Sequence, residues 1–266
     1  MPQGSILSPT LYILFTADLP PPGPWCADIS FADDNSQIVI HPGKDREALA
    51  RCTEREIERI NRYEYEWKIK TNPDKFQLIS ISSTKPKDVI VNGNHIPFKN
   101  EAKILGLTLT RQGLKNHVHQ RKHQANAQQL KLSRFKKLKP ETRLYLFKTM
   151  IRPILEYPAI PLCITSRSSQ LALQREQNKA LRKIHPDNTI HNRMTNESIH
   201  EDLEMETLNI RLYHLASKIW TRLEEINGQL VQTSLDLNLQ RDRRDHSWWP
   251  RLAPYIMANE PNPIFK

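Results

Sequence analysis

Apolar residues in the first 70 positions follow two helical patterns. Ser8-Pro9 favours a helix with Ser8 as its N-cap and the apolar run 11–15 inside it, and the proline-rich segment 20–24 must end that helix. From about Asp45 to Trp67, apolar residues recur at helical spacing among charged side chains. This second pattern predicts one long amphipathic helix.

Short strand-like runs separate and follow these helices. They lie at residues 29–32, 36–40, 76–81, 89–91 and 104–110. Asn92-Gly93, directly after the fourth run, is typical of a β-hairpin turn. We therefore expect a small antiparallel sheet with helices over about residues 1–110.

From about Leu114 onward the pattern is helical. We expect one apolar helix face made of Leu130, Phe135 and Leu138, and a second made of Leu144, Phe147 and Ile151. Further helices are expected over about 171–184 and 199–226. Lys139-Pro140 divides the two faces, because proline cannot continue a helix. Beyond residue 227 apolar residues become sparse. The patterns together predict an α+β fold.

Positive charge is concentrated in the middle of the chain. The 266 residues carry a formal net charge of +10. Residues 1–110 hold 13 basic and 14 acidic side chains, residues 111–186 hold 17 and 3, and residues 187–266 hold 9 and 12. A surface that only solvates a protein mixes both signs, so the middle segment is expected to face a polyanion such as nucleic acid.

Composition argues against several other classes of protein. No apolar run approaches the length of a membrane span, and no secretory signal is visible, so no membrane partner is expected. The widely spaced Cys26, Cys52 and Cys163 indicate reduced thiols in an intracellular protein, nuclear or cytoplasmic, and argue against a disulfide framework. No glycine-rich nucleotide-binding loop occurs.

Two adjacent acids stand between the first two predicted strands. Asp33 and Asp34 follow Phe31-Ala32. Neighbouring carboxylates repel each other, and Mg²⁺ or Mn²⁺ is a common way to stabilise them. Two such ions about 3.5–4 Å apart support phosphoryl transfer. A solvated hairpin turn is the alternative, because aspartate is common in turns.

Segments with the order of the palm motifs of reverse transcriptases occur along the chain. Residues 2–9 (PQGSILSP) are similar to motif B and residues 31–34 (FADD) to motif C. Residues 67–75 (WKIKTNPDK) are similar to motif D and residues 104–109 (ILGLTL) to motif E. Residues 150–157 and 175–182 resemble the helical region that follows the polymerase. Over about residues 2–226 the chain most resembles the enzymes of non-LTR (LINE-type, jockey-like) retrotransposons.

The resemblance implies a catalytic role for three residues. Asp33 would be the main metal ligand of motif C, and Asp34 the second acid, directed differently because successive strand residues face opposite sides. Lys75 would lie near the triphosphate and protonate the departing pyrophosphate, with a solvated lysine as the alternative. Mg²⁺ or Mn²⁺, an RNA template, a DNA primer and dNTP would be the partners of the intact enzyme.

The resemblance also implies residues that hold the nucleic acid. Gln3 and Gly4 would lie against the template and the incoming nucleotide, where glycine permits close approach. Leu105 and Gly106 would form the primer grip, and we expect Leu105 to be buried.

The basic middle segment is expected to contact phosphates without reading sequence. Its candidates for the nucleic-acid backbone are Arg121, Lys122, Lys131, Arg134, Lys136 and Lys137. His119 and His123 have the spacing of a helical metal pair, and His117 lies nearby. No cysteine or acid close by completes a metal site, so surface histidines are the favoured interpretation.

Motif A, which supplies a further metal-binding aspartate in the family, has no counterpart before the motif B segment of this sequence. Asp28 lies an odd number of residues before Asp33, on the opposite face of a strand, and Asp18 resembles a family residue without a metal role. We therefore expect weak or absent metal binding, and no polymerisation by this chain alone.

The expected organisation has three parts. A partial palm covers residues 1–110, a basic all-helical thumb with its extension covers 111–230, and a weakly ordered tail covers 231–266. The expected function is that of a C-terminal fragment of an RNA-directed DNA polymerase. A non-catalytic remnant that grips RNA or duplex through the basic helices is the alternative, and an inert pseudogene product is a third.

Overall fold

The structure, a computed structural model, combines helices with small antiparallel sheets. It describes residues 6–31, 34–40, 45–69, 76–81, 87–91, 93–135, 137–163, 165–187, 194–219, 221–222 and 225. The chain divides into two compact units, Met1–Gly113 and Leu114–Lys266. The strands lie in the first unit, so the mixed α+β character is confirmed. The expected tail at 231–266 lies outside the described residues.

The first unit begins with a short helix and a strand pair. Helix α1 (Ser8–Phe15) precedes strand β1 (Cys26–Phe31), which pairs antiparallel with β2 (Asp34–Val39). The predicted helix start is wrong by one residue, because Leu7 is the N-cap, without a side-chain hydrogen bond, and Ser8 is already helical. Proline fits the first turn, where its missing N–H would have had no partner.

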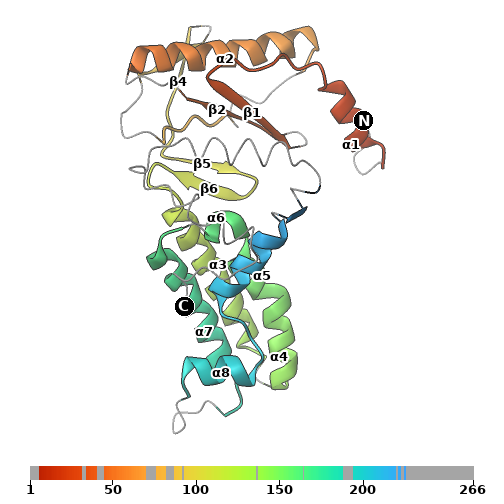
Figure 1. The fold of residues 1–266 in the computed structure, drawn as a ribbon, viewed down its shortest axis with the longest axis vertical. Coiled ribbons are helices and arrows are strands. Elements are labelled where there is room, and N and C mark those ends of the chain that lie inside the picture. The colour runs from red at the N-terminus through yellow and green to blue at the C-terminus, as the bar shows by residue number, and fades with distance from the viewer. Residues whose placement is uncertain are drawn as a thin grey trace. The chain divides into compact units, whose positions relative to one another are not determined.

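Helix α2 (Arg46–Glu66) confirms the predicted amphipathic helix. The Asp45 side chain caps it by accepting hydrogen bonds from the backbone N–H groups of the second and third helical residues. Figure 1 shows α2 running across the strands of this unit. On its buried face, Ala50 and Ile57 pack against Val89 and Val91.

Two further hairpins follow α2. Strand β3 (Val89–Val91) pairs with β4 (Asn94–Ile96), as the turn signal predicted, and β5 (Glu101–Ile104) pairs with β6 (Leu107–Thr110). The single strand predicted at 104–110 is wrong, because a turn at 105–106 splits it. The strand predicted at 76–81 is also wrong: Leu78 forms only an isolated bridge with Phe98.

Arg59 of α2 joins three segments of the first unit. Its Nη2 lies 2.5 Å from Asp28 Oδ2 of β1, its Nε lies 2.8 Å from Glu56 Oε2, and its Nη1 donates to the Pro20 carbonyl. Glu56 Oε1 in turn accepts from the backbone N–H of Gly23 at 3.0 Å. Burial alone would lower the pKa of Arg59, but the hydrogen bonds to Asp28 and Glu56 outweigh it and raise that pKa.

The C-terminal end of α2 holds α1. The Tyr63 hydroxyl donates to Asp18 Oδ1 at 2.9 Å and lies 3.0 Å from the Phe15 carbonyl. Burial, together with the neighbouring Asp18, raises the pKa of Tyr63 to about 12. The Trp67 ring meets Phe15 edge to face, with centroids 5.3 Å apart. Helix α1 is therefore fixed through its last turn.

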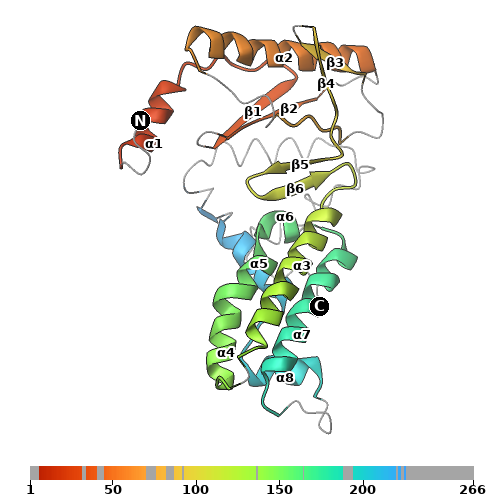
Figure 2. The same ribbon diagram turned by 180° about the vertical axis from the view of Figure 1, so that it is seen from behind.

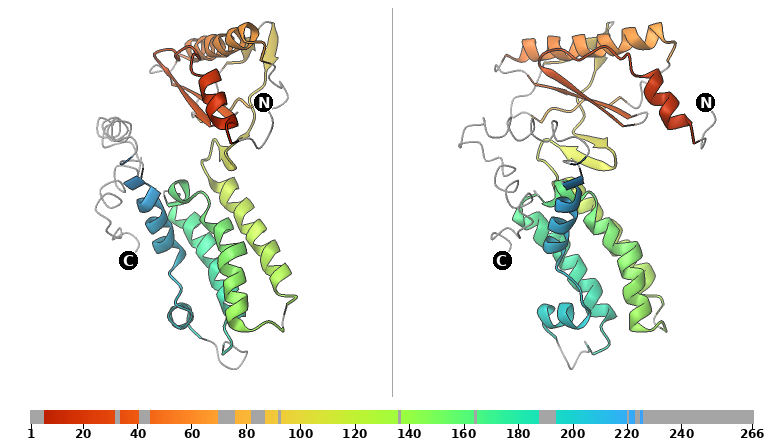
Figure 3. Two further views of the ribbon diagram at one scale, coloured as in Figure 1. Left: turned by 90° about the vertical axis from the view of Figure 1, so that its right-hand side faces the viewer. Right: turned by 45° about the vertical axis from the view of Figure 1, so that its right-hand side comes forward.

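The second unit is entirely helical where it is described. Its elements are α3 (Lys115–Leu132), α4 (Pro140–Leu146), the π-helical turn η2 (Phe147–Ile151), α5 (Arg152–Glu156), α6 (Ala159–Cys163), α7 (Arg167–Ile184), α8 (Asn196–Asp202) and a helix over 208–219. Figure 2 shows α3, α4 and α7 side by side, and Figure 3 shows the helix over 208–219 (blue) beside them. No described helix is both long and apolar enough to cross a membrane.

Helix α7 carries the centre of this unit. Leu173 and Leu181 are fully buried in its core. Three glutamines of the same helix tie neighbouring segments through their amides. Gln170 donates to the Leu162 and Cys163 carbonyls, Gln174 accepts from the Leu208 N–H, and Gln177 donates to the Glu206 carbonyl. The predicted helix at 171–184 is confirmed and begins four residues earlier, at Arg167.

The two predicted apolar faces of the second unit differ in outcome. Phe147 and Ile151 are buried, and the π turn that contains them precedes Pro153. Proline lacks an N–H and clashes with the carbonyl four residues earlier, which explains the wider turn. The prediction that Leu130, Phe135 and Leu138 form a core face is wrong, since Leu130 is 56% and Phe135 57% exposed. Leu130 lies in the last turn of α3, and Phe135 follows the end of that helix.

Replacing Arg59 by methionine should destabilise the first unit. Asp28 and Glu56 have side chains only 13% and 8% exposed, and both would lose their cationic partner. Leaving a buried charge unpaired costs several kcal/mol, so we expect the free energy of unfolding to fall by about 3 kcal/mol. Urea denaturation followed by circular dichroism measures this. Arg55→Met, on the exposed side of α2, is the matched control, and an equal loss in both variants would contradict the buried cluster.

Candidate functional site

The first candidate site is the end of the β1–β2 hairpin. Asp34 opens β2 opposite Phe31 and is exposed. Asp33 lies outside the described residues, as do Gln3, Gly4 and Lys75. Their roles, and the different directions expected for Asp33 and Asp34, stay predictions.

Several apolar side chains of the β1–β2 hairpin and of α1 are exposed. Ile29 and Phe31 of β1 are 51% and 63% exposed, and Ile38 of β2 is 45% exposed. In α1, Ile13 and Leu14 are about two-thirds exposed. Where such side chains form one contiguous patch, they are typical of a surface that contacts another polypeptide.

The described residues do not form a metal site. Among them, no group of three or more histidine, cysteine, aspartate or glutamate side chains is placed to hold an ion. Asp28 is engaged on both oxygens, by Arg59 and by Gln37 Nε2 at 3.1 Å. Asp18 accepts from the Tyr63 hydroxyl. The two acids that precede the Asp33-Asp34 pair in the sequence are therefore used inside the fold.

The predicted primer grip is the turn of the β5–β6 hairpin. Leu105 has φ +48° and Gly106 has φ +77°, and two positive φ values in a two-residue loop are typical of a type I′ turn. Glycine adopts this conformation freely, but a leucine is strained in it. Leu105 is 42% exposed, so the expectation that it is buried is wrong. The tight turn directs its side chain away from the hairpin core.

The basic candidates of α3 separate into two groups. In the first, the charges are engaged inside the helical unit. The Arg121 guanidinium lies over the Tyr157 ring, 5.2 Å from its centroid, and donates to His117 Nε2 at 3.3 Å. Lys122 Nζ lies 3.7 Å from Glu176, whose side chain is 1% exposed. Burial lowers the pKa of Arg121, and burial with the Arg121 charge lowers the pKa of His117.

The second group lies at the end of α3 and in the loop that follows. Lys131, Arg134 and Lys137 are exposed, and no ion pair among the described residues includes them. Lys136 lies outside the described residues. The exposed Phe135 stands among them. Sequence reasoning assigned Phe135 to a core, although its position within a run of lysine and arginine signalled a surface role.

The three histidines of α3 divide in a similar way. His117 is buried, and its Nε2 lies 3.3 Å from the Tyr157 carbonyl oxygen. His119 and His123 are exposed, with their Nε2 atoms 3.1 Å apart. Within the described part of the chain they have no third metal-ligating neighbour, so they do not form a metal site of the usual three or four ligands.

Comparisons with known proteins bear directly on the motif resemblance. The probable RNA-directed DNA polymerase from transposon X-element of Drosophila melanogaster is 26% identical over 260 residues, which cover 92% of this chain and 27% of that protein. The polymerases from mobile element jockey and transposon BS of the same species are 26% and 27% identical, over 84% and 88% of this chain. This chain is similar to the reverse transcriptases of non-LTR mobile elements.

This similarity agrees with the resemblance that the motif segments carry. The chain spans about a quarter of the length of these curated relatives. No family model matches the chain, and no solved structure matches it.

Replacing Leu105 by asparagine should stabilise the β5–β6 hairpin. Asparagine tolerates the left-handed conformation better than leucine, whose strain there is about 1–2 kcal/mol. We expect thermal unfolding of Leu105→Asn to occur a few degrees higher, and that of Leu105→Val lower, because a β-branched side chain tolerates positive φ least. An asparagine variant no more stable than the parent protein would argue against the strained turn.

Proposed function

We propose that this chain is the C-terminal part of a reverse transcriptase of a non-LTR mobile element. The carrying observation is the similarity over most of the chain to RNA-directed DNA polymerases of such elements. The first unit would be part of the polymerase palm, and the second unit its thumb and extension. The order of the four motif segments supports this assignment.

The helical unit is proposed to hold an RNA–DNA hybrid by its backbone. Lys131, Arg134 and Lys137 support this role, because they are exposed and their charges are not neutralised by described carboxylates. Cations of this kind attract phosphates irrespective of sequence. Arg121 and Lys122 would act indirectly, by fixing the α3 helix to α5 and α7.

Catalysis is proposed to need polypeptide beyond this chain. The relatives are about four times longer than this chain, and in them the polymerase activity belongs to the longer protein. The exposed apolar side chains of α1 and β1–β2 would then be covered by another part of the same polymerase. Mg²⁺ binding in that larger protein would involve Asp33 and Asp34.

A non-catalytic nucleic-acid-binding protein is the second candidate function. The observation that favours it is the exposed basic surface of Lys131, Arg134 and Lys137, which no described carboxylate neutralises. The two candidate functions use the same nucleic-acid-binding surface. They differ only in whether this chain belongs to a larger protein that polymerises DNA. Binding and primer extension therefore test separate parts of the proposal.

Removing the exposed charges should weaken binding to an RNA–DNA hybrid. In a triple variant with alanine at Lys131, Arg134 and Lys137, the slope of log K against log salt should fall by about two to three, since each phosphate contact contributes about 0.9. Fluorescence anisotropy with a labelled hybrid measures this. The control carries alanine at the equally exposed Lys148, Arg167 and Arg175. Absence of binding at low salt by the parent chain would refute the proposed function.

The chain alone should not extend a DNA primer on an RNA template in the presence of Mg²⁺ and dNTP. The physical reason lies in the proposed need for further polypeptide, because Mg²⁺ requires near-ideal octahedral coordination, which the Asp33-Asp34 pair by itself would not supply. A gel-based extension assay reads this out, with Asp33→Ala as the test variant and Asp88→Ala, at an exposed acid, as its control. Extension lost in Asp33→Ala and kept in Asp88→Ala would overturn this prediction.

A further inference from the structure

An exposed aromatic residue lies in the most basic part of the helical unit. Phe135 follows the end of α3 and is 57% exposed. Residues 128–148 contain seven lysines and arginines and a single acid, Glu141. Single exposed apolar side chains are common on proteins, so a ligand is indicated here only by the cavities and charges beside Phe135.

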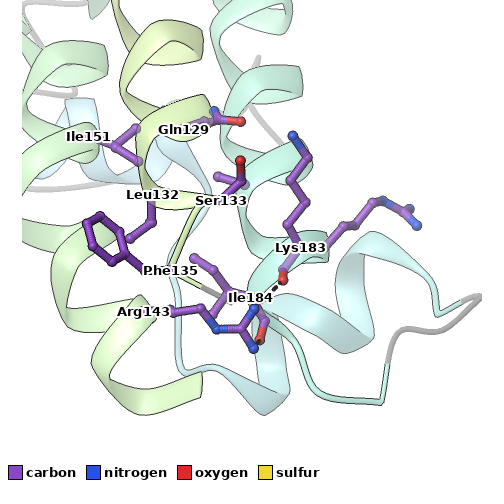
Figure 4. Close-up of a pocket in the computed structure, with 10 residues that line it drawn as sticks. Gln129, Leu132, Ser133, Phe135, Arg143, Ile151, Lys183 and Ile184 are labelled. Atoms are coloured by element: carbon purple, nitrogen blue, oxygen red, sulfur yellow. Dashed lines mark hydrogen bonds between the residues drawn. The ribbon is translucent and has the colours of Figure 1, made fainter. Parts of the chain in front are cut away.

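Phe135 also lines two cavities of the helical unit. One, of about 460 Å³, lies between the end of α3, α4 and the end of α7, and Figure 4 shows Leu132 and Phe135 on one side of it with Lys183 and Ile184 on the other. The second, of about 510 Å³, is lined by Leu138, Leu146 and Met150 together with Phe135. Both volumes lie in the range of small-molecule sites.

The walls of the second cavity combine apolar side chains with positive charge at one edge. Lys131 and Arg134 line it beside Phe135, and both are exposed. Among the described residues neither takes part in an ion pair. A ligand that matches this site has an apolar planar part for the cavity and negative charge next to it.

A nucleotide of a single strand has this combination. Its base is a planar ring that can stack on an aromatic side chain, and its phosphate is anionic. The end of the chain itself matches less well, because residues 227–266 contain five basic and four acidic side chains and so offer no complementary charge. A duplex also matches less well, since its bases are paired and stacked and cannot enter a side-chain cavity.

We propose that Phe135 is a stacking platform for an unpaired base of single-stranded nucleic acid, with Lys131 and Arg134 on the adjacent phosphates. The proposal rests on the proposed function, in that both use the basic end of α3. It goes further, because it assigns a base-binding site and a strand form. The hybrid would be held by charge alone, and a single strand by charge and stacking together.

The test compares single-stranded and hybrid ligands with the full chain. Fluorescence anisotropy would use a labelled single-stranded RNA, the DNA of the same sequence, and the RNA–DNA hybrid. Phe135→Ala should weaken binding of the single strands by about tenfold, in line with the contribution of one stacked base, and leave hybrid binding unchanged. The RNA and DNA strands distinguish recognition of the 2′-hydroxyl from stacking alone.

Two further variants separate stacking from folding and from apolar contact. Phe135→Trp should keep single-strand binding, whereas Phe135→Leu should lose it as alanine does, because leucine fills space but has no aromatic face. Tyr145→Ala removes another exposed aromatic ring of the same unit, outside both cavities, and should change nothing. Circular dichroism of each variant should match that of the parent chain.

The outcomes separate failure of this inference from failure of the proposed function. Binding of single strand and hybrid with no effect of Phe135→Ala would overturn the stacking site and leave the proposed function standing. Equal loss for single strand and hybrid in Phe135→Ala would also overturn it, because Phe135 would then contribute to both ligands alike and not to an unpaired base. No binding of either ligand at low salt would refute both proposals.

Discussion

Negative charge is scarce in the first part of the helical unit, and this scarcity decides how its few carboxylates are used. Residues 111–186 contain seventeen basic side chains and three carboxylates. Glu176 is buried between α3 and α7 and faces two lysines, and Glu156 lies between two arginines. Both carboxylates are placed where helices meet, because an uncompensated charge in a buried contact is costly. The third, Glu141, starts α4, so the cations at the end of α3 keep their charge toward solvent.

The first unit depends on a different arrangement of charge. Arg59 is nearly buried between Asp28 and Glu56, and through them α2 holds β1 and the proline-rich segment before it. This use of Asp28 has a consequence for function. A carboxylate already shared between Arg59 and Gln37 is a poor metal ligand, so Asp28 is not available to complete a metal site at this hairpin.

Local patterns were good guides where one interaction dominated. The long charged helix was predicted from its spacing, and Asp45 caps it as its residue type favours. The Asn92-Gly93 hairpin and the helix ending at Ile184 were also predicted. The patterns failed where a run of β-branched and apolar residues had no partner strand, as around Leu78, and where a turn at Leu105 interrupted such a run. Strand propensity indicates that a segment would fit into a sheet, but it does not indicate that a second strand is present to pair with it.

The sequence by itself determined the family resemblance, the helical character of the second unit and the concentration of charge in it, because these properties depend on residue order alone. Only the tertiary structure decided which cations are free to meet a ligand. Arg121 and Lys122 look equivalent to Lys131 and Arg134 in the sequence, yet the first two are engaged by Tyr157 and Glu176. The structure likewise turned Phe135 outward. Exposure is a property of packing between distant segments, and no local pattern contains it.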